Sequence, residues 1–244
     1  GGQSVPNFDY AMAEGVKKTY RKQYFRALAQ YIEVRFDMSA SDAAALTAAI
    51  KEALGTDVTM HTAEAYAEKL RAFLPRHQAE NGFQIITGDA ARAAAEYAAK
   101  TAYKETDATT YQAMEALVHN LNTMNSRAGA QVPFSSLNYG TDTSPEGRMA
   151  VHNLLRATEA GLGDGETPIF PVQIFKVKEG VNYNEGDPNY DLFRHALRCS
   201  AKRLFPNFSF QDAPFNLQYY KEGHPETEIA YMGCRTRVVL SLIH

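Results

Sequence analysis

Apolar positions in the first half of the chain follow helical spacing. Over residues 9–36 they recur at almost every fourth position, which predicts a first helix with Asp9 available as its cap. The apolar stripe consists of Met12, Val16, Tyr20, Tyr24, Leu28 and Tyr31 or Ile32. Basic residues on the same helix are typical of a solvated face, or alternatively of a surface that contacts phosphates or a partner subunit. They are Lys17, Lys18, Arg21 and Lys22.

Start and stop signals predict two further helices. Ser39 or Ser41 opens the second helix, and Gly55 closes it. Thr62 opens the third, and Pro75 is expected to stop it, because proline lacks the backbone N–H that a helix needs.

Helical patterns continue after a short turn-rich piece. A small strand is possible at Phe83–Ile86. The alanine-rich region 89–104 has high helix propensity and permits close packing, and Thr106–Asn122 has helical periodicity. The first 122 residues are therefore expected to be mainly helical.

Strands and helices alternate after residue 130. Strand patterns cover Gln131–Asn138, Ile169–Val177, Asn207–Phe210, Pro214–Tyr219 and Glu228–Met232, and helix patterns run from Ser144 to near Gly161 and from Asp187 to Leu204. Such alternation is typical of right-handed βαβ crossovers and a parallel sheet. We therefore expect one partial α/β domain over residues 1–244, mainly helical over 1–122 and α/β over 123–244, with its sheet or barrel only partly present.

Composition narrows the class of protein. Apolar residues make up 45% of the 244 positions and charged residues 22%, as in an ordinary soluble domain with a substantial core. The net charge of −3 gives no electrostatic reason to expect direct binding of nucleic acid. No apolar run approaches the ~18 residues of a membrane span. Two cysteines do not make a disulfide framework, so a reducing, cytoplasmic setting is expected.

The two cysteines have different surroundings in sequence. Cys199 falls on a predicted helix and is interpreted as a small buried apolar residue. Cys234 falls between two apolar strand-like runs, directly after Gly233, which allows a tight turn. Arg235 and Arg237 would lower the pKa of this thiol if they pointed toward it. From the residues alone, a structural and a catalytic Cys234 both stay open.

Other motifs indicate no known site. The glycines of residues 161–165 follow a helix rather than a strand, so a helix C-cap and loop are favoured over a phosphate-binding loop. The seven histidines include no pair at zinc-binding spacing, and His119 and His195 are interpreted as structural. The turn at residues 126–130 is small and polar, so its backbone could approach a ligand closely.

Several long sequence words, in order, resemble one enzyme family. The words are NLNTMNSRAGAQVPFSSLNYGT at residues 120–141, FPVQIFKVKEGVNYN at 170–184, LFPNFSF at 204–210 and AYMGCRTR at 230–237. They resemble the anaerobic, oxygen-sensitive class III ribonucleoside-triphosphate reductases. GGQS at residues 1–4 also looks like a stretch inside the catalytic domain of that family. The resemblance covers nearly the whole chain and is strongest over 106–237.

This resemblance implies a glycyl-radical enzyme built on a ten-stranded α/β barrel. In such an enzyme a loop inside the barrel presents a cysteine, which is Cys234 by motif match. The radical would convert that thiol to a thiyl, which removes the 3′ hydrogen of the ribose, and the 2′ hydroxyl leaves as water. Formate is the expected reductant, and the product is a deoxyribonucleoside triphosphate. Because a hydrogen-atom carrier needs S–H rather than a thiolate, the arginines would then be positioning groups.

Substrate contacts are expected around residues 120–141. The predicted contacts are Arg127, Gly129, Ser135, Ser136 and Asn138, with Met232 as an apolar group that shields Cys234. Strand alternation allows at most one of the two serines to point into the site. Arg127 is interpreted equally well as a phosphate ligand or as a structural group at a helix end. The family also implies a homodimer, nucleotide effectors, for which the basic cluster is one candidate surface, and a radical-SAM activating enzyme.

Some parts of the family pattern are missing from this sequence. The glycyl-radical segment and the cysteine-rich zinc site should follow Cys234, and a second active-site cysteine should precede Gly1. We therefore expect a fragment that is inactive as an isolated chain. A catalytically inactive nucleotide-binding or interaction module on the same scaffold is the alternative, and the retained Cys234 argues against it. A formate-lyase relative is disfavoured by the SRAGAQ word.

Overall fold

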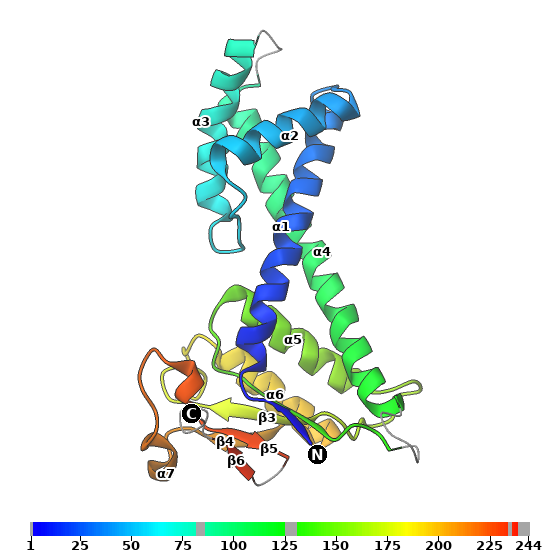
Figure 1. Ribbon diagram of the computed structural model, residues 1–244, viewed down its shortest axis with the longest axis vertical. Coiled ribbons are helices and arrows are strands. Elements are labelled where there is room, and N and C mark those ends of the chain that lie inside the picture. The colour runs from blue at the N-terminus through cyan, green and yellow to red at the C-terminus, as the bar shows by residue number, and fades with distance from the viewer. Residues whose placement is uncertain (1, 82–85, 125–130, 234–235, 239–244) are drawn as a thin grey trace. The chain divides into compact units, whose positions relative to one another are not determined.

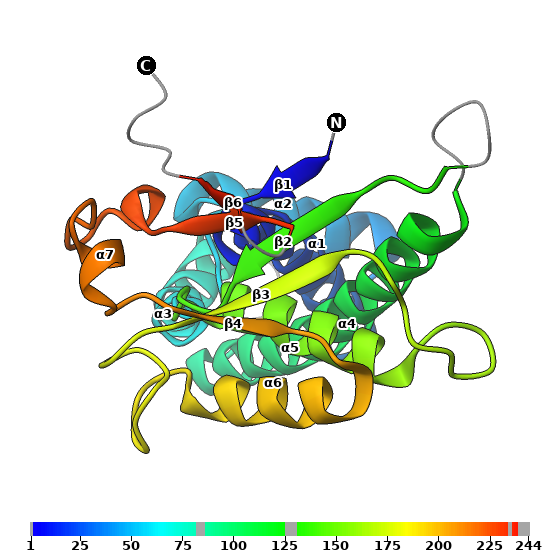
Figure 2. The same cartoon turned by 90° about the horizontal axis from the view of Figure 1, so that it is seen from below.

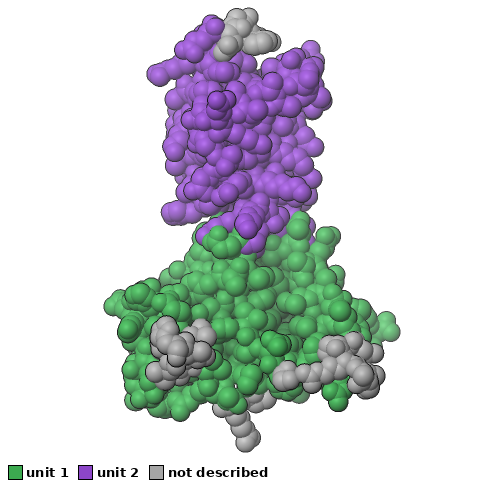
Figure 3. Space-filling model, in the orientation of Figure 1, with its two compact units in different colours: residues 1–14, 109–244 green, residues 15–108 purple. Residues whose placement is uncertain are grey.

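The computed structural model describes residues 2–81, 86–124, 131–233 and 236–238. The chain divides into two compact units (Figure 3). One unit consists of residues 15–108, and the other of residues 1–14 and 109–244. The expectation of a single catalytic domain over the whole chain stays a prediction.

Residues 15–108 form a helical unit. It contains most of α1 (Phe8–Arg35), α2 (Ala40–Leu54), α3 (Ala63–Asn81) and the first part of α4 (Gly88–Thr123) (Figure 1). The apolar stripe predicted from the sequence is its core: Tyr24, Leu28 and Ile32 are fully buried. The alanine-rich region packs closely as expected, with Ala91, Ala94, Ala95, Ala98 and Ala102 all at most 1% exposed.

Two boundaries in this unit differ from the prediction. The third helix continues past Pro75 to Asn81. Leu70 and Leu74 are both fully buried, so packing of this face outweighs the hydrogen bond that proline removes. The stretches 89–104 and 106–122 form the single helix α4. The possible strand at Phe83–Ile86 lies, except for Ile86, outside the described residues.

The other unit is built on a four-stranded parallel sheet. Its strands are β1 (Gln3–Val5), β2 (Ser135–Tyr139), β3 (Val172–Val177) and β4 (Asn207–Phe210), in that order across the sheet. Helices α5 (Pro145–Ala160) and α6 (Tyr190–Arg203) supply the crossovers from β2 to β3 and from β3 to β4. The predicted α/β class and parallel sheet are confirmed, whereas the described strands do not close into a barrel.

The two faces of this sheet carry different elements. Helices α5 and α6 cover one face, and a hairpin of β5 (Ala230–Met232) and β6 (Thr236–Val238) lies against the other (Figures 1 and 2). Strand alternation assigns the side chains of β2 to these faces. Tyr139 contacts Phe175 edge to face and donates a hydrogen bond to Gln173, whose amide donates to Thr158 of α5. Ser136 and Asn138 reach the hairpin instead.

Prolines explain most differences between predicted and observed strands. Strands β2 and β3 begin two and one residues after Pro133 and Pro171, because proline cannot donate to a strand ladder. The predicted strand Pro214–Tyr219 is wrong. Residues Pro214–Leu217 form the short helix α7, in which Pro214 occupies the favoured first position.

The short strands β1 and β6 were not predicted. Each has three residues, so neither carries a recognisable alternation, and each is specified by its partner in the fold. Pro225–Thr227 adds one 3-10 turn before β5. Among the helices of the described part of the chain, none combines the length and apolar character needed to cross a membrane.

Candidate functional site

The sequence-predicted residues Ser136 and Asn138 meet the hairpin that leads to Cys234. Asn138 is fully buried, and its side chain bonds the backbone of Tyr231 in both directions. The Tyr231 N–H donates to Asn138 Oδ1 at 2.7 Å, and Asn138 Nδ2 donates to the Tyr231 carbonyl at 2.9 Å. The N–H of Gly233 donates to the Ser136 hydroxyl at 3.3 Å. Strand β2 therefore holds the hairpin through side chains.

The other predicted site residues make no described contact with the backbone of the hairpin strand from side chains of β2, or lie outside the described residues. By alternation Ser135 lies on the opposite face of β2 from Ser136, and its buried hydroxyl has no hydrogen-bond partner among the described residues. Met232 is 36% exposed and pairs with Thr236 across the hairpin. Cys234, Arg127 and Gly129 lie outside the described residues.

A buried ion pair, which the sequence reading missed, lies beside the hairpin. Lys176 of β3 is fully buried, and its Nζ donates to Glu228 Oε2 at 3.0 Å and to Asn7 Oδ1 at 2.6 Å. Thr141 donates to the same Glu228 oxygen at 2.7 Å. Glu228 is 5% exposed and lies two residues before β5. This network connects the carboxyl end of the parallel sheet to the start of the hairpin.

Asp9 organises the loop that follows β2. It was predicted to cap the first helix, but that helix begins at Phe8 and Asp9 lies in its first turn. Its Oδ2 accepts hydrogen bonds from the N–H groups of Gly140, Thr141 and Asp142 at 2.8, 3.1 and 3.0 Å. Three converging N–H groups are a strong cradle for a carboxylate. Asp9 thereby fixes the position of Thr141 next to Glu228.

The sequence signals for these charged residues were weak but present. Lys176 lies between the apolar residues Phe175 and Val177 in a strand predicted to be buried, and a lysine there must find a buried partner. That partner is 52 residues away, so no local pattern could identify it. Among the described residues, no group of three or more His, Cys, Asp or Glu side chains is arranged to hold a metal ion.

Cys199 is buried, as the sequence predicted. It is fully buried on α6, and its thiol donates to the carbonyl of Leu155 at 3.7 Å. Burial, reinforced by the charge of Glu159, raises the pKa of the Cys199 thiol to about 11. His195 is also buried. Its Nε2 lies 3.2 Å from Glu159 Oε2, and burial lowers its pKa.

We expect iodoacetamide to modify Cys199 very slowly in the native chain at pH 7. With a pKa of about 11, only about one thiol in ten thousand is ionised, and the thiolate is the reactive form. Mass spectrometry of each cysteine peptide measures the rate. The same chain in denaturant is the control, in which Cys199 should react at the rate of an ordinary thiol. Equal rates in the native and unfolded chains would contradict a buried Cys199.

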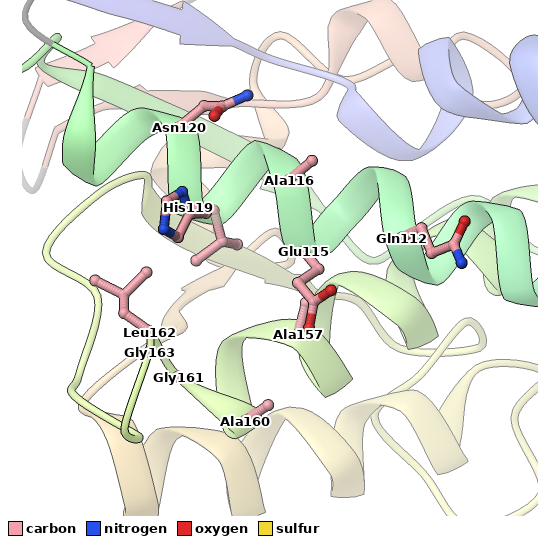
Figure 4. Close-up of a pocket in the computed structure, with 11 residues that line it drawn as sticks. Gln112, Glu115, Ala116, His119, Asn120, Ala157, Ala160, Gly161, Leu162 and Gly163 are labelled. Carbon is pink, nitrogen blue, oxygen red and sulfur yellow. The ribbon is translucent and has the colours of Figure 1, made fainter.

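A separate hollow lies between α4, α5 and the loop after α5 (Figure 4). Its volume is about 490 Å³, and His119, Glu115 and Leu162 are among the residues that line it. Gly161, also in its wall, has φ of 85° and donates its N–H to the carbonyl of Ala157, so it is the C-cap of α5 as predicted. Of the sequence-predicted substrate residues that the structure describes, Ser135, Ser136, Asn138 and Met232, none lines this hollow.

Comparison with known proteins gives a consistent result. A family model described as anaerobic ribonucleoside-triphosphate reductase matches residues 1–241. The anaerobic ribonucleoside-triphosphate reductase of Escherichia coli strain K12 is 37% identical over 127 residues, which are 52% of this chain and 17% of that protein. The protein of the same name from Enterobacteria phage T4 is 39% identical over 136 residues, which are 55% of this chain and 22% of that protein. The matched stretches therefore span about a fifth of these curated relatives.

Proposed function

Because the chain belongs to the anaerobic ribonucleoside-triphosphate reductase family, we propose that it is the middle part of the catalytic domain of such an enzyme. The reaction is the anaerobic reduction of a ribonucleoside triphosphate to the deoxyribonucleoside triphosphate. The observation that carries the proposal is the hairpin β5–β6, which leads to Cys234 and is held by buried polar side chains on the sheet face opposite the helices. A cysteine presented there fits the family's radical chemistry.

The role of Cys234 in this proposal is to carry a hydrogen atom. Its thiol gives up the atom to a glycyl radical on a segment that is not in this chain. It then takes the 3′ hydrogen of the ribose, and the 2′ hydroxyl leaves with a proton as water. Formate supplies two electrons while it is oxidised to carbon dioxide, and the thiol returns its hydrogen atom to C3′, which regenerates the thiyl. The buried, hydrogen-bonded base of the hairpin supports this role, because a mobile hairpin would expose the radical to solvent.

The surrounding fold is consistent with part of a ten-stranded barrel. Parallel strands with helices on one face and a hairpin on the other are what a barrel wall and its inner loop require. Among the remaining predicted substrate contacts, Arg127, Gly129, Ser136 and Met232 stay part of the proposal, whereas Ser135 lies by alternation on the face of β2 away from the hairpin. Asn138 is better suited to positioning, because its amide is committed to the hairpin backbone.

Partners and setting also belong to the proposal. They are a ribonucleoside triphosphate substrate, nucleotide effectors, a radical-SAM activating enzyme, a second copy of the protein in a homodimer, and the cytoplasm as location. The family's zinc site would involve residues outside this chain. No base preference follows from the residues described.

The function is tested with the complete polypeptide to which we assign this chain. It is activated without oxygen by a radical-SAM activating enzyme and incubated with formate and each of the four ribonucleoside triphosphates. We expect a glycyl-radical signal in electron spin resonance, and deoxyribonucleoside triphosphate by chromatography. The 244-residue chain alone should give neither. Nucleotide binding without product, despite a full radical signal, would favour the inactive-module alternative.

A further inference from the structure

The strand that leads to Cys234 has an unusual second edge. On one side β5 pairs with β6, and on the other it lies next to β1 and β2 without pairing to them as a strand. A buried strand edge leaves backbone N–H and C=O groups that need partners. In this hairpin side chains supply those partners.

Two side-chain amides bind this edge in the same way. Asn138 exchanges two hydrogen bonds with the backbone of Tyr231, as described above. Gln211, directly after β4, does the same for Ile229. The Ile229 N–H donates to Gln211 Oε1 at 3.2 Å, and Gln211 Nε2 donates to the Ile229 carbonyl at 3.2 Å. Each amide therefore replaces one residue of a neighbouring strand.

Both amides are themselves fixed in place. Gln211 is 4% exposed, its Nε2 also donates to the Ser209 hydroxyl at 2.9 Å, and its own N–H donates to the carbonyl of Val177 at 2.8 Å. The Ser4 hydroxyl of β1 donates a further bond to the Tyr231 carbonyl at 3.0 Å. The edge is thus bound by side chains that the parallel sheet holds rigidly.

The third contact continues the series to the residue before Cys234. The Gly233 N–H donates to Ser136 Oγ at 3.3 Å. Ile229, Tyr231 and Gly233 are alternate residues, so their N–H groups point to the same edge of the strand. Their acceptors are the side chains of Gln211, Asn138 and Ser136, which we call the side-chain ladder.

We infer that the side-chain ladder sets the register of the hairpin, and that Gln211, Asn138 and Ser136 are positioning residues for Cys234. The positioning role for Cys234 rests on the proposed function. The hydrogen bonds of the ladder do not depend on that function. A backbone ladder would tolerate a slip by two residues, since every strand residue offers the same groups. Side chains at three fixed places do not, so the strand is fixed along its length as far as Gly233, the residue before Cys234.

The test compares ladder amides with matched amides elsewhere. Asn138→Leu and Gln211→Met keep roughly the size of the side chain but lose both the acceptor and the N–H donor, and Ser136→Ala is a milder third variant. Gln173→Met is the matched control, because Gln173 is a fully buried amide of the same sheet that bonds Tyr139 and Thr158 on the helix side. Hydrogen exchange of the 244-residue chain measures the amides of Ile229, Tyr231 and Gly233.

Exchange at these three amides should be at least about tenfold faster in the ladder variants and unchanged in the control. In the activated complete polypeptide, we expect the Asn138 and Gln211 variants to lower kcat about 10- to 100-fold with an unchanged KM for nucleotide, because the hairpin and not the substrate is displaced. Unchanged exchange in all three ladder variants would overturn the ladder. Faster exchange with full kcat would overturn its positioning role. If the ladder variants exchange faster but the unsubstituted complete polypeptide makes no product, the ladder is retained and the proposed function is refuted.

Discussion

Replacing Cys234 with alanine is expected to abolish deoxyribonucleotide formation, with kcat lowered by a factor on the order of 10³ or more. The physical reason is that the S–H bond of cysteine is close in strength to the C–H bonds from which it exchanges hydrogen. Alanine has no hydrogen atom held by such a bond. Cys234→Ser should fail as well, since an O–H bond is much stronger than an S–H bond. The measurement is product formation by the activated complete polypeptide.

The radical signal of the same variant and a control substitution at the other cysteine make this prediction specific. The glycyl-radical signal should still form in Cys234→Ala, because the radical belongs to another segment, so activation and turnover separate. Cys199→Ala is the matched control. That thiol is fully buried against Leu155, with a pKa raised to about 11, and its removal should leave kcat unchanged. Product formation by Cys234→Ala at the unsubstituted rate would refute the proposed function.

Periodicity in the sequence predicted the parts of the fold that are local. The stripe at Tyr20, Tyr24 and Leu28 is buried as expected, because a long helix must bury its apolar face. The buried strand predicted at Ile169–Val177 is the fully buried parallel strand β3, Val172–Val177. Pro75 and Pro214 show the limit of local rules. Packing of α3 outweighs the tendency of Pro75 to end a helix, and Pro214 starts a short helix where the sequence pattern predicted a strand.

The candidate site could be predicted only in part. Motif resemblance predicts that Cys234, Ser136 and Asn138 belong to one site, and the structure places Ser136 and Asn138 against the hairpin strand that precedes Cys234. The sequence carries no signal for Gln211 and only a weak one for Lys176, because each is defined by a partner far along the chain. Long-range pairing of buried polar groups leaves no periodic signal, and only the folded chain reveals it.

Lys176→Met is expected to destabilise the sheet unit by about 3–5 kcal/mol. Lys176 and Glu228 are 1% and 5% exposed at their side chains and 3.0 Å apart, so removal of the lysine leaves a buried carboxylate without its cation. The double variant Lys176→Met/Glu228→Gln should regain much of the loss, because no uncompensated charge is then buried. The measurement is hydrogen exchange of the β3 amides across a urea series, which reports this unit separately from the helical one.

Lys178→Met provides the matched control for this prediction. Lys178 is two residues away and also forms an ion pair, with Asp212 at 3.2 Å, but its partner is 41% exposed. Water solvates that carboxylate after the substitution, so we expect a loss of at most about 1 kcal/mol. Because Glu228 lies two residues before β5, Lys176→Met should also speed exchange at Ile229, whereas Lys178→Met should not. Equal losses from the two substitutions would show that the Lys176–Glu228 pair is solvated like a surface pair and does not anchor the hairpin.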